Sequence, residues 1–187
     1  MFGRSDFANS IWNAKAQWEV VAKTLGEVQF PPITTLRIRF DALSSESLKE
    51  LLKSVPSGYA KADSDTDYIY VIQISDGATG MVGELQTQLQ KEKKNGTDYP
   101  RINAAHQDGI TLYVGRSRNL KKRLREHLGA EAPGVYALHL KRWAPSVKAE
   151  IVISVIRFHE THDLVVQTIE DGIWETLKPA FGRKGGR

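Results

Sequence analysis

The fold is decided by the segment from Thr111 to Leu128, which reads TLYVGRSRNLKKRLREHL. Leu112 to Gly115 has the composition of a short strand, and its glycine permits a tight turn. Asn119 to Leu128 then reads as a basic helix. Tyr113 in the strand and Arg123 in the helix are ten residues apart. This arrangement can bring a phenol and a guanidinium together over one phosphate group.

Further strands are expected on both sides of this segment. Tyr68 to Ile74 is rich in β-branched and aromatic residues and predicts a buried strand. Ala149 to Phe158 has the same character. Thr35 to Phe40 alternates apolar and polar residues, which is typical of a short strand. Strands and helices are therefore expected to share one fold.

Helical spacing of apolar residues recurs along the chain. The expected helices are Asp6 to Leu25, the residues after Ser44, Val82 to Lys94, Val135 to Trp143, and Asp163 to Leu177. The four tryptophans are expected in the core, at Trp12, Trp18, Trp143 and Trp174. No internal repeat and no low-complexity tract is found.

Composition sets limits on the class of protein. The chain has 187 residues, of which 41% are hydrophobic and 26% are charged, so a packed core is expected. It has no cysteine, which excludes disulfides and thiolate zinc sites. A net charge of +4 permits a nucleic-acid partner without requiring one. No signal peptide or membrane span is recognisable, so a soluble, cytoplasmic protein is expected.

Five polar residues form an ordered set along the chain. Taken singly, each has an ordinary structural interpretation: tyrosines pack in strands, and a glutamate on a helix is usually surface charge. Arg123 and His127 are four residues apart and share a helix face. The full set is Tyr70, Tyr113, Arg123, His127 and Glu170.

In this order and spacing the chain resembles the GIY-YIG nuclease family. The first motif is present as Tyr68-Ile69-Tyr70 and the second as Tyr113-Val114-Gly115. The helical arginine of the family matches Arg123, and the histidine one turn later matches His127. The metal-binding glutamate of the family matches Glu170.

The resemblance implies an α/β (α+β) fold with a central three-stranded antiparallel sheet flanked by helices. The nuclease domain would cover residues 67–182, with an insert at 75–110 between the first two core strands. Residues 1–66 would form an N-terminal extension that reads DNA or dimerises, and 183–187 a basic tail. Three departures from the family pattern are Tyr68 in place of the first glycine, the long insert, and Gly182 in place of a frequent asparagine.

The resemblance also implies the chemistry of phosphodiester hydrolysis. Glu170 would bind Mg²⁺ or Mn²⁺, because a carboxylate supplies the hard oxygen that these ions prefer. Arg123 would bind the scissile phosphate through two hydrogen bonds. We expect Tyr70 to act as the base with help from His127, and Tyr113 to orient water or phosphate. Basic residues expected to contact the DNA backbone are Arg116, Arg118, Lys121, Lys122 and Arg125.

Several functions remain open at this point. The extension and the insert favour a restriction-like endonuclease that cuts double-stranded DNA, and a homodimer on DNA is one arrangement left open. A repair nuclease and a mobile-element nuclease are alternatives within the family. A non-catalytic DNA-binding module with a degenerate site is the competing class, favoured by Gly182. RNA is a weaker alternative as substrate.

Overall fold

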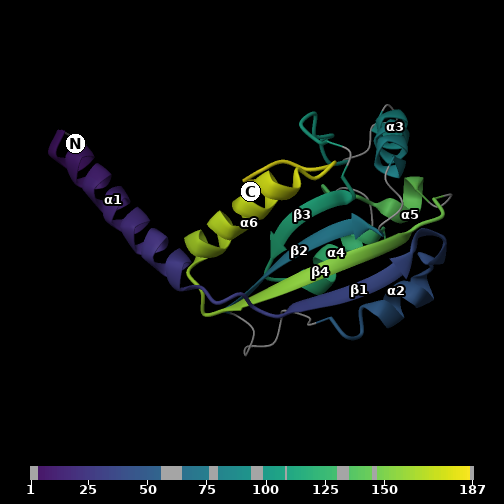
Figure 1. Ribbon diagram of the computed structural model, residues 1–187, viewed down its shortest axis with the longest axis horizontal. Coiled ribbons are helices and arrows are strands. Elements are labelled where there is room, and N and C mark those ends of the chain that lie inside the picture. The colour runs from purple at the N-terminus through teal and green to yellow at the C-terminus, as the bar shows by residue number, and fades with distance from the viewer. Residues whose placement is uncertain are drawn as a thin grey trace.

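The structure is a computed structural model, and it describes residues 4–55, 65–75, 80–93, 99–107, 109–129, 135–144 and 147–185. Figure 1 shows one sheet with helices on both sides and a long N-terminal helix that projects from the body. The helices are α1 (Arg4–Glu27), α2 (Ser45–Leu51), α3 (Met81–Lys93), α4 (Leu120–Leu128), α5 (Leu140–Trp143) and α6 (Asp163–Leu177), with a 3-10 turn η1 (Phe40–Ala42).

The sheet is antiparallel and has four strands in the order β1-β4-β2-β3. The strands are β1 (Ile33–Arg39), β2 (Thr66–Ile74), β3 (Thr111–Ser117) and β4 (Glu150–His159). The mixed, antiparallel fold class is confirmed, but the expected number of three strands was wrong. The reason is that β1, from the N-terminal segment, pairs along its whole length with β4, from Ile33 opposite Ile156 to Arg39 opposite Glu150.

Both faces of the central strand β2 are covered, which explains why its sequence is apolar throughout. On one face, Tyr68, Tyr70 and Ile72 join a large core with residues of α2, α3, α4 and α5. On the other face, Ile69 packs against Val166 of α6 in a smaller cluster. The alternation of side chains along a strand thus divides β2 between two layers of helices.

The insert and part of the N-terminal segment contribute to the large core. Leu85 and Leu89 of α3, within the insert, are fully buried. Phe40 and Leu48, which precede residue 67, belong to the same cluster. Both segments therefore help to hold the sheet that carries the candidate site.

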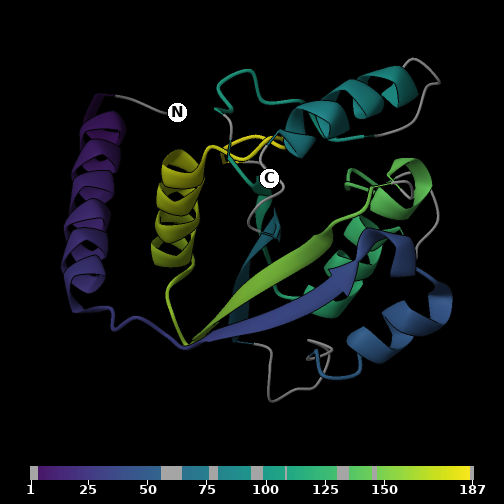
Figure 2. The same ribbon diagram turned by 45° about the vertical axis from the view of Figure 1, so that its right-hand side comes forward.

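The helix α1 lies beside α6 and away from the sheet, as Figure 2 shows. Val21 is its buried residue among those described. Trp12 and Trp18 are 70% and 55% exposed, so the expectation that they lie in the core was wrong. Trp143 is buried as expected. Among the described helices, none is long and apolar enough to cross a membrane.

Candidate active site

A cleft of about 740 Å³ is bounded by residues of β2, β3, α4 and α6. Tyr70 of β2, Tyr113 of β3, Arg123 of α4 and Glu170 of α6 line this cleft together. These positions are up to 100 residues apart in the sequence, and the sheet and its flanking helices bring them to one place.

The pairing of β2 with β3 fixes the two tyrosines. Tyr70 lies directly opposite Gly115. A Cβ atom at position 115 would lie 2.5 Å from the Tyr70 hydroxyl and 2.7 Å from the Tyr113 ring. Glycine is therefore required here by space. Its absence of a side chain lets the two rings stack, with centroids 6.2 Å apart and planes 14° from parallel.

His127 is fully buried beneath Tyr70 and makes two hydrogen bonds. The backbone N–H of Leu138 donates to Nδ1 of His127 at 3.2 Å. Because Nδ1 accepts that bond, the proton of the neutral imidazole resides on Nε2. Nε2–H therefore donates to the Tyr70 oxygen, 3.0 Å away. Burial, with a contribution from Arg123, lowers the pKa of His127 well below its usual value, so the ring stays neutral.

The Tyr70 phenol keeps its proton in the absence of other molecules. Burial raises its pKa well above the usual value of 10.0, and the nearby Tyr113 adds to this rise. The guanidinium of Arg123 acts in the opposite direction, because a cation favours the phenolate. The local charges thus compete over the ionisation of this one hydroxyl.

Arg123 is held in place by two neighbours. Its Nη1 donates to Glu126 Oε2 at 2.8 Å, and its Nη2 donates to the Tyr113 hydroxyl at 3.4 Å. Burial works to lower the pKa of Arg123, but the surrounding Tyr70 and Tyr113 outweigh it and raise the pKa. The group therefore stays cationic. The contact between Arg123 and Glu126 was not predicted from the sequence, although residues three apart on one helix are close enough to interact.

Glu170 is half-buried on α6. Gln167 donates through Nε2 to Glu170 Oε2 at 3.2 Å and to Asp171 Oδ1 at the same distance. In the described part of the chain, no group of three or more histidine or carboxylate side chains is placed to hold a metal ion. A metal at this cleft would therefore depend on fewer than three protein carboxylates, together with water and substrate oxygens.

Residues 104–184 match the family model of the GIY-YIG catalytic domain. This segment belongs to the GIY-YIG family. No curated protein and no solved structure matches the chain. The matched residues include Tyr113, Arg123, His127 and Glu170, while Tyr70 lies before them. The sheet register brings Tyr70, which lies outside the match, opposite Gly115 of the second GIY-YIG motif.

The backbone at position 182, where many GIY-YIG proteins have asparagine, has a conformation that favours glycine. Its φ is +97°, a backbone conformation that residues other than glycine rarely adopt. A Cβ atom there would also lie 3.0 Å from the Tyr113 ring. The Gly182 N–H donates to the carbonyl of Arg101 at 2.8 Å, which fixes this part of the cleft rim.

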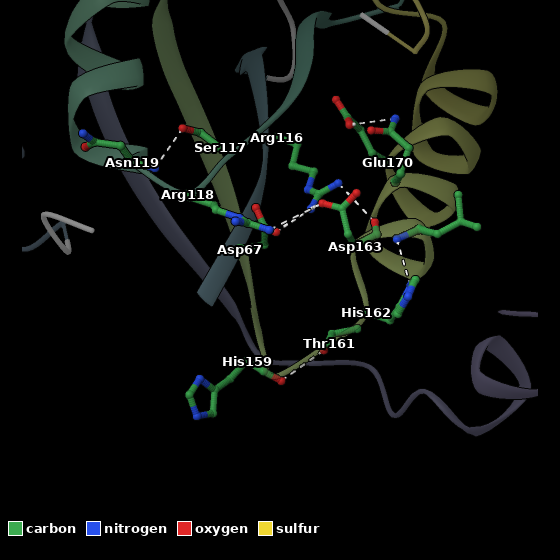
Figure 3. Close-up of polar contacts among 12 residues, drawn as sticks. Asp67, Arg116, Ser117, Arg118, Asn119, His159, Thr161, His162, Asp163 and Glu170 are labelled. Atoms are coloured by element: carbon green, nitrogen blue, oxygen red, sulfur yellow. Dashed lines mark hydrogen bonds and ion pairs between the residues drawn. The ribbon is translucent and has the colours of Figure 1, made fainter. Parts of the chain in front are cut away.

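Arg116, expected to contact DNA, lines the cleft and is also enclosed by carboxylates (Figure 3). Its side chain is 8% exposed, and Nη2 is bonded to Asp67 and, at 2.6 Å, to Asp163. Nη1 also donates to the backbone carbonyl of Asp163 at 3.1 Å. This cluster ties β2 and β3 to the first residue of α6, the helix that carries Glu170. We infer a positioning role for Arg116 from this arrangement.

The remaining basic residues differ in location. Arg118 lines the cleft with a mostly exposed side chain, 3.4 Å from Asp67. Among the described residues that line the cleft, Lys121, Lys122 and Arg125 do not occur. Arg101 and Tyr136 line it without having been expected. Arg183, the first residue of the expected basic tail, lines it as well. No sequence motif marks Arg101 or Tyr136, because separate loops bring them to the rim.

The segment before α5 also departs from expectation. A helix was predicted from Val135 to Trp143, but α5 covers only Leu140–Trp143. His139 has a φ of 51°, in the left-handed region, which stops a helix from extending toward Val135. Tyr136 therefore lies on an irregular segment at the cleft.

Proposed function

We propose that this protein is a metal-dependent endonuclease that hydrolyses phosphodiester bonds in DNA. The observation that carries the proposal is the meeting of Tyr70, Tyr113, Arg123 and Glu170 in one cleft of a GIY-YIG domain. Hydrolysis of a phosphodiester needs a base for water, a cation for the phosphoryl oxygens and help for the leaving oxygen. These side chains can supply each of those groups.

Arg123 is the proposed ligand of the scissile phosphate. Glu126 and the Tyr113 hydroxyl fix its guanidinium before substrate arrives. A pre-positioned cation stabilises charge that develops on the non-bridging oxygens without costly rearrangement. Tyr113 is proposed to orient the attacking water or the phosphate.

Tyr70 is the proposed base. Burial keeps the phenol protonated, so Tyr70 must lose this proton to solvent before it can accept one from water, and the cation of Arg123 favours the loss. The Nε2–H of His127 then donates to the phenolate oxygen and stabilises it. Water gives a proton to Tyr70 as its oxygen bonds to phosphorus. The bond from phosphorus to the 3′ oxygen breaks, and the 3′ oxygen takes a proton from solvent.

Glu170 is the proposed metal ligand. A half-buried carboxylate that lines the cleft and is oriented by Gln167 suits Mg²⁺ or Mn²⁺, which retain several waters when bound to protein. The bound ion would supply positive charge beside the leaving oxygen.

The change Tyr70→Phe tests this assignment, because it removes only the hydroxyl group. We expect turnover to fall at least about 100-fold, the usual size of a lost general base, with DNA affinity nearly unchanged. Tyr99→Phe is the matched control, since Tyr99 is a buried tyrosine outside the residues that line the cleft. Near-normal cleavage by Tyr70→Phe would show that another group is the base.

Restriction-like specificity is the finer proposal. The exposed helix α1, with Trp12 and Trp18 on its surface, is a candidate for reading DNA or for forming a homodimer. Sequencing of the ends left on a mixed DNA pool tests it. Defined sequences at the ends support restriction-like cleavage, whereas ends that cluster at flaps or junctions support a repair role.

A non-catalytic DNA-binding module is the second candidate. Two observations favour it: Gly182 replaces the common asparagine of the family, and burial keeps Tyr70 protonated. Such a module would bind DNA at the same cleft and leave it intact with Mg²⁺ and with Mn²⁺.

A further inference from the structure

Tyr136 is an exposed aromatic residue on a rigid support. Its side chain is 66% exposed, while the next two residues, Ala137 and Leu138, are fully buried. The Leu138 N–H is bonded to His127, and the Leu138 carbonyl accepts from Trp143 Nε1 at 2.5 Å. His139 donates through Nε2 to the Val135 carbonyl at 2.8 Å, which closes the segment around Tyr136. The backbone under the ring is therefore fixed on both sides.

The ring of Tyr136 lines the same cleft as Tyr113, Arg123 and Glu170. The exposed ring contributes little to the hydrophobic core, in which the neighbouring Ala137 and Leu138 are buried instead. An aromatic ring left in water at the edge of a reactive cleft is well suited to contact a flat, apolar surface.

Cationic side chains line the cleft as well. The bond from Gly182 N–H to the Arg101 carbonyl and the bridge between Ile102 and Phe181 bring two chain segments together. These segments place Arg101 and Arg183 at the cleft, where Arg118 also lies. An aromatic ring beside several arginines is the combination that binds a nucleotide, with the base stacked on the ring and the phosphates near the cations.

We propose that Tyr136 stacks on an unpaired nucleobase next to the scissile phosphate. Bases inside a duplex already stack on each other, so a base outside the helical stack can use the ring without the cost of unstacking. The cleft therefore prefers DNA that has an unpaired or extruded nucleotide beside the cleaved bond. This inference rests on the proposed nuclease function and narrows its substrate class.

Binding and fluorescence measurements test the proposal on full-length protein carrying Glu170→Gln, which keeps the DNA intact. The probe is a duplex with one unpaired 2-aminopurine, compared with the same duplex fully paired. Adding Tyr136→Ala should weaken binding of the unpaired probe by about 5- to 100-fold and abolish the fluorescence quenching. Binding of the paired probe should change less than about twofold. Tyr136→Phe, which keeps the ring, should bind both probes as the parent does.

Val135→Ala is the matched control, because Val135 is the exposed neighbour that does not occur among the cleft-lining residues described. The proposal is overturned if Tyr136→Ala binds the unpaired probe as tightly as the parent, or if Tyr136→Phe loses as much affinity as Tyr136→Ala. Cleavage of the same duplexes by wild type distinguishes failure of the stacking inference from failure of the nuclease proposal. If wild type cleaves and Tyr136→Ala has no effect, only the stacking inference fails. If the wild type neither cleaves nor binds either probe, the nuclease proposal and this inference fail together.

Discussion

Two arginines of one strand–turn–helix segment have opposite environments. Arg116 is enclosed by Asp67 and Asp163, so its charge is matched inside the protein. Arg123 has one carboxylate partner, Glu126, and otherwise faces phenols at the cleft. The comparison shows that a run of basic residues in a sequence is not a uniform DNA-binding surface. What surrounds each guanidinium decides whether it holds the fold or is available to substrate.

The two arginines are also connected through α6. Arg116 binds the first residue of this helix, Asp163, and Glu170 lies two turns later on the same helix (Figure 3). The enclosed arginine therefore helps to place Glu170, which lines the same cleft as Arg123. We therefore expect substitution of Arg116 to lower mainly stability and substitution of Arg123 to lower mainly turnover.

The largest expected effect is on stability, at Arg116. Arg116→Met leaves Asp67 buried beside a weaker partner, and removal of one member of a buried ion pair costs about 3–5 kcal/mol of unfolding free energy. Denaturant unfolding measures the loss. Arg118→Met is the matched control, because Arg118 contacts the same carboxylate from an exposed position and should change stability by less than about 1 kcal/mol. Equal losses in the two variants would remove the distinction between enclosed and exposed arginines.

The next effect is on catalysis, at Arg123. Arg123→Ala should lower kcat by about 100- to 1,000-fold, the usual result of removing one pre-positioned donor to a developing anion. Glu126→Gln is added so that no buried carboxylate loses its partner. Arg125→Ala on the same helix is the control and should act mainly on KM. A kcat within tenfold of wild type in the Arg123 variant would place the phosphate elsewhere.

A smaller effect is expected at Gly182, beside Tyr113. Gly182→Asn restores the common family residue but forces a side chain into a left-handed backbone and against the Tyr113 ring. We expect a loss of stability of about 1–3 kcal/mol and no gain in turnover. Thermal unfolding and cleavage rates measure both quantities. A variant that is as stable as wild type and more active would show that the backbone at position 182 accepts asparagine and that the missing side chain limits turnover.

The smallest effect is a pH dependence of stability at His127. Its pKa in the folded protein lies well below 6.5, so the unfolded chain binds the proton more readily. Stability should therefore fall as the pH drops below about 6.5, down to the folded pKa. Unfolding curves from pH 7 to pH 5 should show this slope, and His127→Gln should reduce it. An unchanged slope in the variant would assign the dependence to other groups.

Local patterns in the sequence predicted all four strands, whereas the antiparallel α/β arrangement was implied by the resemblance to the GIY-YIG family. Strands such as Tyr68 to Ile74 carry strong composition signals, because both of their faces are buried. The edge position of β1 was missed, since pairing with β4 joins residues more than 100 positions apart. The exposure of Trp12 and Trp18 was missed because helical spacing alone does not show what covers a helix.

At the candidate site, the residues expected to act together do line one cleft, with His127 directly behind Tyr70. The partners of Arg116 were not predictable, because Asp67 and Asp163 are 49 and 47 residues away along the chain. The position of Tyr136 at the cleft was not predicted for a different reason. Its segment has helix-like composition, and the left-handed backbone of His139 is set by tertiary contacts rather than by local propensity.

Incubation of supercoiled plasmid DNA with Mg²⁺ or Mn²⁺ tests whether Glu170 and its neighbours form a working nuclease site, with wild-type protein compared with Glu170→Ala. The proposed function predicts nicked or linear products with wild type, intact plasmid with the variant, and intact plasmid with wild type after chelation of the metal. Equally intact plasmid with wild type and Glu170→Ala, on duplex and single-stranded substrates alike, would contradict the nuclease assignment and favour the binding module.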